Sequence, residues 1–277
     1  MTLFTRNRLF KAGIVFSSVC MILAITATII IIPVYPQMET EITRRSEGIF
    51  NGYLIESMDA HLLAVNAGIL ALVVYSLVTI ALIYYFFEKT QSPEILFVLF
   101  FAASFSAEVF RLLIPLGRVV FITPLYSFMT SRIILFSRHF GIFSLFAASV
   151  FAVGYTTQQQ RNILLFIITA ALIIALGVPI DTQTWDSSLS MIIGYSSMLK
   201  LIEAGAFLIT TVSFFVAAWL RGSREYVFIG TGSALAFLAR NILVHTDTWA
   251  GLPVGIVLLA LGTWLICTNL HKIYLWL

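Results

Sequence analysis

Eight long apolar runs divide this chain and constrain its fold more than any other feature. They cover residues 11–34, 62–87, 93–116, 127–153, 162–178, 189–220, 226–244 and 252–268. An α-helix rises about 1.5 Å per residue, so segments of this length can cross a hydrocarbon core about 30 Å thick. The sequence therefore predicts an all-α, polytopic membrane helix bundle with about eight transmembrane helices.

Little of the chain is left over for a soluble domain. Only 10% of the 277 residues are charged, whereas soluble domains average about 25%. The longest polar stretch, residues 37–61, is too short to build a core of its own. We therefore expect one membrane-embedded domain over residues 1–277. It comprises an N-terminal span (1–34), an extracytoplasmic segment (35–61) that forms a short amphipathic helix, and a seven-helix bundle (62–277).

The distribution of Lys and Arg predicts how the bundle is oriented. The segments expected inside hold eight basic residues: Arg6, Arg8, Lys11, Lys89, Arg161, Arg221, Arg224 and Lys272. The loops expected outside hold only three: Arg44, Arg45 and Arg118. Because basic residues favour the cytoplasmic side, both termini are expected in the cytoplasm. The first apolar run is longer than the core of a cleaved signal peptide, so we expect it to remain as a span.

Charged residues inside the spans are the strongest indication of function. Glu108 and Arg111 lie one turn apart in the third run, where a charge near the bilayer centre costs about 2.5 to 3.5 kcal/mol. Such side chains must face protein or water. Other titratable side chains fall on the fourth, sixth and seventh runs, mostly in their outer halves: Arg132, Arg138, His139, Lys200, Glu203 and Arg240. If the helix faces that carry them converge, the bundle holds a polar cavity open to the outside.

The balance of these charges predicts what the cavity binds. Five bases and two acids leave a net charge of +3 before His139 is counted. A spacing of three residues lets Glu108 pair with Arg111, and Glu203 with Lys200, so three arginines lack an acid. Arginine favours planar anions such as carboxylate and phosphate. We therefore expect a binding site for an anionic small molecule or a lipid headgroup, formed by Glu108, Arg111, Arg132, Arg138, His139, Lys200, Glu203 and Arg240.

The same residues also have a purely structural interpretation. Arg132 and Arg240 can extend to lipid headgroups at the outer surface. Glu108 and Arg111 can hold helices together, and His139 is then a buried histidine with its hydrogen bonds satisfied. In that case the charges stabilise the bundle and bind nothing.

Motifs for metals, cofactors and known catalytic machinery are missing from the sequence. The histidines show no metal-ligand or bis-histidine haem spacing within one helix, although a pairing of His139 with His245 stays open. Cys20 and Cys267 lie in apolar runs and are interpreted as core residues. Signatures of nucleotide-binding loops, serine hydrolases and zinc proteases are not found. No metal, cofactor or catalytic residue is assigned, and whether the protein is an enzyme stays open.

Four functions fit this pattern. The first is a membrane-embedded binding or sensory module that signals through a partner protein; the seven-helix set is similar in shape to receptor-like modules. The second is an intramembrane enzyme acting on a lipid-linked or phosphate-bearing substrate, with Glu108 or His139 as general base. The third is a transporter, disfavoured because the inner half has few polar residues, and the fourth is a structural subunit of a membrane complex. Membrane lipid is an expected partner, short loops suit a bacterial inner membrane, and no nucleic-acid partner is expected.

Overall fold

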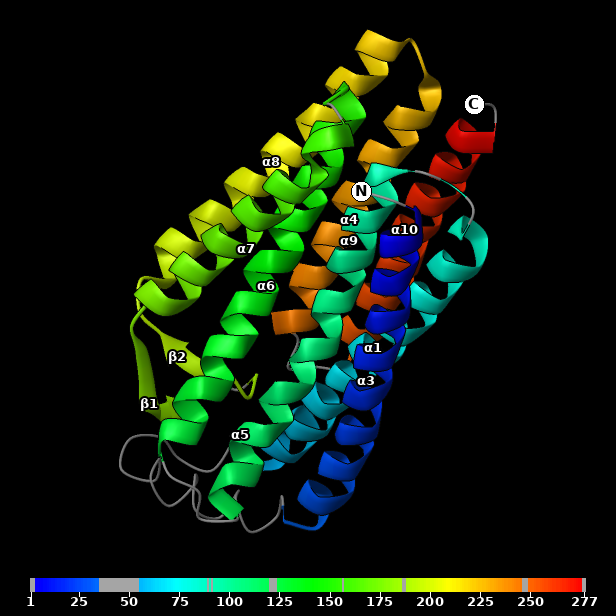
Figure 1. Ribbon diagram of the computed structural model, residues 1–277. Helices are drawn as coiled ribbons and strands as arrows, with labels where there is room; N and C mark the ends of the chain where they lie inside the picture. The colour runs from blue at the N-terminus through cyan, green and yellow to red at the C-terminus, as the bar shows by residue number, and fades with distance from the viewer. Residues whose placement is uncertain are drawn as a thin grey trace.

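The computed structural model of the protein describes residues 3–34, 55–88, 90, 92–119, 124–155, 157–185, 188–245 and 249–275. Within these residues, eight helical segments are long and apolar enough to cross a membrane, which confirms the predicted polytopic bundle (Figure 1). The α-helices are α1 (Leu3–Ile31), α3 (Ile55–Phe87), α4 (Pro93–Ser104), α5 (Phe110–Val119), α6 (Pro124–Val153), α7 (Gln160–Gly177), α8 (Ser196–Arg221), α9 (Arg224–His245) and α10 (Gly251–Leu275). The remaining described elements are the short 3₁₀ helices η1 (Ile32–Val34), η2 (Phe105–Val109) and η3 (Thr157–Gln159), and the strands β1 (Ile180–Trp185) and β2 (Met191–Ile193).

Both ends of the chain lie at the same end of the bundle, as an even number of spans requires (Figure 1). The antiparallel strands β1 and β2 lie at the opposite end. We call the strand-bearing end the outer end, because the distribution of Lys and Arg predicts that it faces away from the cytoplasm; the other is the inner end. The amphipathic helix predicted over 35–61 falls mostly outside the described residues. Its last residues, 55–61, do not form a separate helix, because they are the first residues of α3, which continues into the second span.

The third span, formed by α4, η2 and α5, is the most enclosed part of the bundle. In its most apolar window 83% of the residues are buried, compared with 17% for α7. α4 begins with a serine cap, because Ser92 Oγ accepts a hydrogen bond from the Ile95 amide at 3.3 Å and Pro93 is the first helical residue. α4 packs against α6, while α1 and α3 pack against η2. A charged residue on this span must therefore find its partners within the protein.

The third span is not a continuous α-helix. η2 tightens the chain over five residues before α5 resumes. Three buried hydroxyls meet beside it: Ser106 Oγ lies 2.8 Å from Ser17 Oγ on α1 and 2.7 Å from Ser76 Oγ on α3. Short 3₁₀ stretches inside a helix often mark functional or strained positions, and this one carries Glu108.

Small residues bring α9 and α10 into close contact. A Cβ atom on Gly262 would lie 2.7 Å from the Gly232 carbonyl oxygen and 2.7 Å from the Ala236 amide nitrogen. A larger side chain would push the two helices apart, so this contact fixes the position of α9 and of Arg240, one turn beyond Ala236.

The sixth span begins later than the sequence predicts. The prediction of one helix over 189–220 is wrong for its first turns, because α8 starts at Ser196 and the preceding residues form β2, paired with β1. Leu189 and Tyr195 adopt left-handed backbone conformations, with φ of 57° and 56°, which a helix does not allow. The Gly194 amide closes the base of the hairpin by donating to the Pro179 carbonyl at 2.9 Å. A short, largely apolar run such as 189–193 fits a strand or a helix equally well by periodicity.

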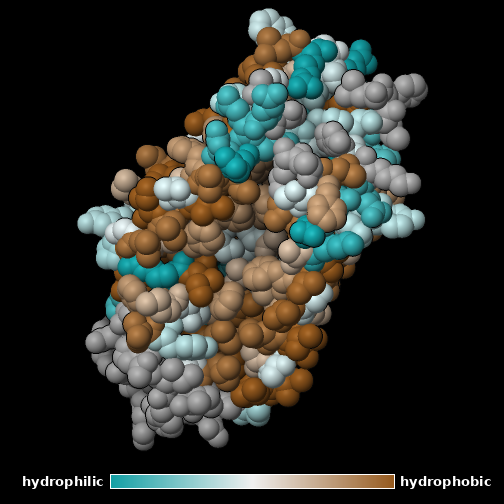
Figure 2. All heavy atoms as spheres, viewed as in Figure 1, coloured by the Kyte–Doolittle hydropathy of each residue, from teal (hydrophilic) through white to brown (hydrophobic). Residues whose placement is uncertain are grey.

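Hydrophobic side chains form much of the outer surface of the bundle. Figure 2 shows hydrophobic residues across the middle of the visible face and the largest group of hydrophilic residues toward its upper end. Large apolar side chains point outward from α7 and α8, including Phe166, Leu201 and Trp219 at 71%, 75% and 82% exposure. This surface is suited to contact with membrane lipid.

Candidate functional site

Four buried charged residues meet in the outer half of the bundle, and each comes from a different element. Glu108 lies on η2, Arg111 on α5, Arg138 on α6 and Arg240 on α9, with exposed fractions of 2%, 1%, 9% and 2%. The sequence indicated these residues separately, and the structure brings them into one connected network. We call these four residues the outer charge cluster.

Glu108 is the centre of the outer charge cluster. Its Oε1 accepts from Arg138 Nε at 2.8 Å and its Oε2 accepts from Arg138 Nη2 at 2.8 Å. Arg111 Nη1, three residues away on the same span, lies farther from Oε2 at 3.3 Å. The predicted pair with Arg111 is present, but the bidentate partner comes from α6. Bidentate arginine–carboxylate pairs are strong and geometrically specific, so this one fixes α6 against η2.

The β1–β2 hairpin supplies the next partners of the arginines. Arg111 donates through both Nε and Nη2 to the Ser188 carbonyl oxygen, with Nε at 2.9 Å. Arg138 Nη2 lies 3.4 Å from Ser190 Oγ. Between these serines, Leu189 is buried in an apolar cluster with residues of α1, α3 and α5. The sequence prediction missed both serines: it placed Ser190 inside the predicted helix 189–220, and Ser188 contributes a backbone carbonyl, which residue type does not reveal.

Arg240 connects the outer charge cluster to α8. Its Nη2 lies 3.6 Å from Glu203 Oε1 and donates to the Arg138 carbonyl oxygen at 3.3 Å. The predicted pair between Glu203 and Lys200 does not form among the described residues, and the Lys200 side chain is exposed. The acid on α8 is therefore matched by a base on α9.

Arg132 does not join the outer charge cluster, contrary to the sequence-based expectation. Its Nη1 donates to the carbonyl oxygens of Ala175 and Val178, the latter at 2.5 Å. Its guanidinium also lies over the Phe128 ring, 4.6 Å from the ring centroid. A cation at the end of a helix binds free carbonyls and is favoured by the helix dipole. Arg132 thus caps α7, while its Nε is buried without a hydrogen-bond partner among the described residues.

A partly enclosed cavity of about 90 Å³ lies beside the cluster, between α6, β2, α8 and α9. Its polar lining consists of Arg138, His139, Ser196, Lys200, Glu203, Arg240 and His245. Ser196 begins α8 and His245 ends α9, and both are exposed. The cavity is therefore reached from the outer end of the bundle.

His139 brings a buried imidazole to this cavity. Its Nδ1 lies 2.9 Å from the Leu135 carbonyl oxygen, which can only accept, so Nδ1 carries the hydrogen and Nε2 of the neutral ring is an acceptor. The side chain is 2% exposed, and Nε2 has no hydrogen-bond partner among the described residues. The expectation of a fully satisfied buried histidine is therefore wrong for this nitrogen.

The lining of the cavity is positively charged. Arg138, Lys200 and Arg240 bring three positive charges against one negative charge on Glu203, a balance of +2. Glu108 behind Arg138 lowers it to +1. The described residues include no group of three His, Cys, Asp or Glu side chains placed to hold a metal ion. A cavity with this balance favours an anion.

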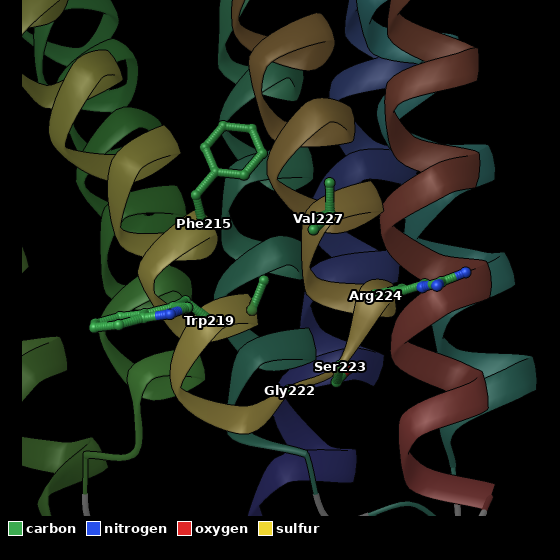
Figure 3. Close-up of a pocket in the computed structure, with 7 residues that line it drawn as sticks. Phe215, Trp219, Gly222, Ser223, Arg224 and Val227 are labelled. Atoms are coloured by element: carbon green, nitrogen blue, oxygen red, sulfur yellow. The ribbon is translucent and has the colours of Figure 1, made fainter.

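Two other hollows have a different character. One, of about 280 Å³, lies at the turn between α8 and α9; Figure 3 shows the side chains of Trp219 and Arg224 pointing in opposite directions. The other, of about 410 Å³, is an apolar groove between α3 and α10, where the Tyr75 hydroxyl is paired with Thr263. Neither of these two hollows is lined by several charged side chains, whereas the outer cavity is.

Comparisons with known proteins give no relative from which a function could be inferred. No protein-family model matches the chain, and no curated protein and no solved structure matches it.

Proposed function

We propose that this protein is a membrane-embedded binding module that takes a small anion from the outer side. The observation that supports it is the positively charged lining of the outer cavity, in which three cations face the Glu203 carboxylate and the balance stays at +1 once Glu108 behind Arg138 is counted. Charge of this kind attracts an anion to a low-dielectric site and holds it there. The mouth of the cavity at Ser196 and His245 gives the anion a route from the outer surface.

The dimensions of the cavity favour a small ligand. A volume of about 90 Å³ holds several water molecules, which suits a compact anion or the charged tip of a lipid headgroup. A drug-sized ligand requires at least about 300 Å³. Arg240 brings a flat guanidinium group to the cavity, and this group matches carboxylate and phosphate oxygens, whereas the Arg138 guanidinium is already bound to Glu108.

The position of the cavity gives a means of signalling. Its walls come from α6, α8 and α9, three helices that also pack on one another. An anion bound between these helices changes how strongly they attract each other. A partner protein bound to the exposed side of α8 would detect this change, so the same site can act as a sensor.

A structural subunit of a membrane complex is the competing function, and one observation favours it. Glu108 is matched by two arginines, and these arginines also bind the hairpin. A network closed in this way can stabilise the bundle without any ligand.

Thermal unfolding of the purified full chain in detergent separates the two functions. Phosphate or acetate is added at constant ionic strength, with chloride as the reference anion. An anion at about 100 times its Kd stabilises the folded state by about 2.7 kcal/mol, so the wild type is expected to unfold at a higher temperature. Arg240→Gln is expected to remove this increment, because Arg240 lines the cavity.

Arg132→Gln is the matched control, since it removes an arginine from the outer half without touching the cavity. It is expected to keep the full anion-dependent increment relative to its own baseline. No increment in the wild type, or an equal loss in both variants, would overturn the binding function and favour the structural subunit.

A further inference from the structure

The outer cavity contains unused hydrogen-bond acceptors as well as cations. Glu203 lines the cavity, and its ion-pair partner among the described residues is Arg240, whose Nη2 lies 3.6 Å from Oε1. That separation exceeds hydrogen-bond distance. The carboxylate therefore keeps lone pairs that none of the described residues uses.

The second acceptor is His139. Because Nδ1 is committed to the Leu135 carbonyl, Nε2 of the neutral ring offers a lone pair, and this buried nitrogen is without a partner in the described part of the chain. A site built only for a fully ionised oxyanion would present donors alone. Here two acceptors on α6 and α8 belong to the same lining as the donors Lys200 and Arg240.

This combination discriminates between anions that differ in one hydrogen. An oxyanion without a hydrogen would bring its lone pairs against the Glu203 carboxylate, and both groups would lose hydration without gaining a bond. An oxyanion that keeps a hydroxyl donates that hydrogen to an acceptor, while its remaining oxygens accept from Arg240 and Lys200. Sites built to bind a hydroxyl reject the analogue that lacks it.

We propose, on the basis of the anion-binding function above, that the ligand is a phosphate group that retains a P–OH hydrogen. Glu203 accepts this hydrogen, with His139 as the second acceptor, and the cations hold the other oxygens. Inorganic phosphate and the monoanionic form of a phosphomonoester lipid headgroup both offer this chemistry, whereas sulfate is fully ionised at neutral pH. A phosphodiester headgroup also lacks the hydrogen.

Isothermal titration of the full chain in detergent with inorganic phosphate and with sulfate tests the proposal, at neutral pH and matched ionic strength. The wild type is expected to bind phosphate about ten- to a hundredfold more tightly than sulfate, the effect of one hydrogen bond to a charged group. Glu203→Gln replaces an acceptor oxygen by an N–H donor and is expected to abolish or reverse this preference.

Lys200→Gln is the control variant. It removes a cation from the same cavity and is expected to weaken both anions alike while keeping the preference for phosphate. If Glu203→Gln does not fold, His139→Leu takes its place and is expected to reduce the preference. Equal binding of phosphate and sulfate by the wild type would overturn this inference and leave anion binding standing, whereas binding of neither, with no lipid retained, would overturn both.

The source of the phosphate is distinguished in lipid nanodiscs. Phosphatidylcholine nanodiscs with and without phosphatidate are compared by native mass spectrometry. Phosphatidate retained by the wild type and lost in Glu203→Gln supports a lipid headgroup. Binding of inorganic phosphate without retention of phosphatidate supports a free anion.

Discussion

The two ends of the bundle bury charge in different ways, and the inner end uses neutral partners. The Glu94 carboxylate, 1% exposed, accepts from Ser92 Oγ at 2.9 Å and from the Tyr274 hydroxyl at 2.6 Å. Arg6 donates to two backbone carbonyl oxygens at the end of α3, both at 2.8 Å. The helix dipole favours an acid at the start of α4 and a base at the end of α3.

The outer end instead pairs cations with carboxylates around a cavity. Glu108 and Glu203 bind arginines from other spans, and cations outnumber acids in the cavity lining. The comparison teaches that a buried charge does not by itself indicate a ligand. Buried donors without a described partner occur at both ends, on Arg6 as well as on Arg132. What distinguishes the outer end is a cavity beside the charges whose lining holds more cations than acids.

The largest expected effect comes from removing a carboxylate at each end. Glu108→Leu leaves Arg111 and Arg138 without their acid, and breaking a buried ion pair in this way is expected to lower the free energy of unfolding by about 3–5 kcal/mol. Glu94→Leu leaves only neutral hydroxyl donors behind, for which about 1–3 kcal/mol is expected. Chemical unfolding in mixed micelles measures both. Equal losses would break the distinction between the two ends.

The fold followed from the sequence wherever the length of an apolar run decided the structure. Eight spans were identified because each run reaches the length of about 17 residues or more that a transmembrane helix needs. The β1–β2 hairpin was missed, since residues 189–193 are apolar except for Ser190 and precede a true span. The 3₁₀ turn η2 was also missed, because it is set by packing against α1 and α3 and not by residue type.

The composition of the outer charge cluster could be predicted, but its pairing could not. Glu108, Arg111, Arg138 and Arg240 all belong to it, and all four were singled out because they are charged residues inside apolar spans. Spacing along a helix reveals only partners on that helix, so the bond from Arg138 to Glu108 stayed hidden. Arg132 was misassigned because its acceptors are backbone carbonyls, which every helix end offers.

A smaller effect is expected from removing one donor at the inner end. Tyr274→Phe deletes the 2.6 Å hydrogen bond to the buried Glu94 carboxylate, and about 1–3 kcal/mol of unfolding free energy should be lost. Tyr84→Phe is the control, because the hydroxyl of Tyr84 donates to the exposed Glu88 at 3.1 Å. Water can replace that bond, so a change of less than about 0.5 kcal/mol is expected. A loss in Tyr84→Phe as large as in Tyr274→Phe would show that burial of the carboxylate is not the cause.

The smallest effect is expected for Arg132→Gln, and comparing it with Arg138→Gln separates an arginine bound to backbone carbonyls from one bound to a carboxylate. Arg132→Gln gives up bonds to the end of α7 that an amide can partly replace, and about 0.5–1.5 kcal/mol is expected. Arg138→Gln removes the bidentate partner of Glu108 and should destabilise the protein by more than that, since a carboxylate that is 2% exposed keeps only Arg111. Thermal unfolding of the two variants in one detergent gives the difference directly. If Arg132→Gln were the more damaging of the two, helix capping and not the ion pair would hold the outer end together, and the two ends of the bundle would bury charge by one common mechanism.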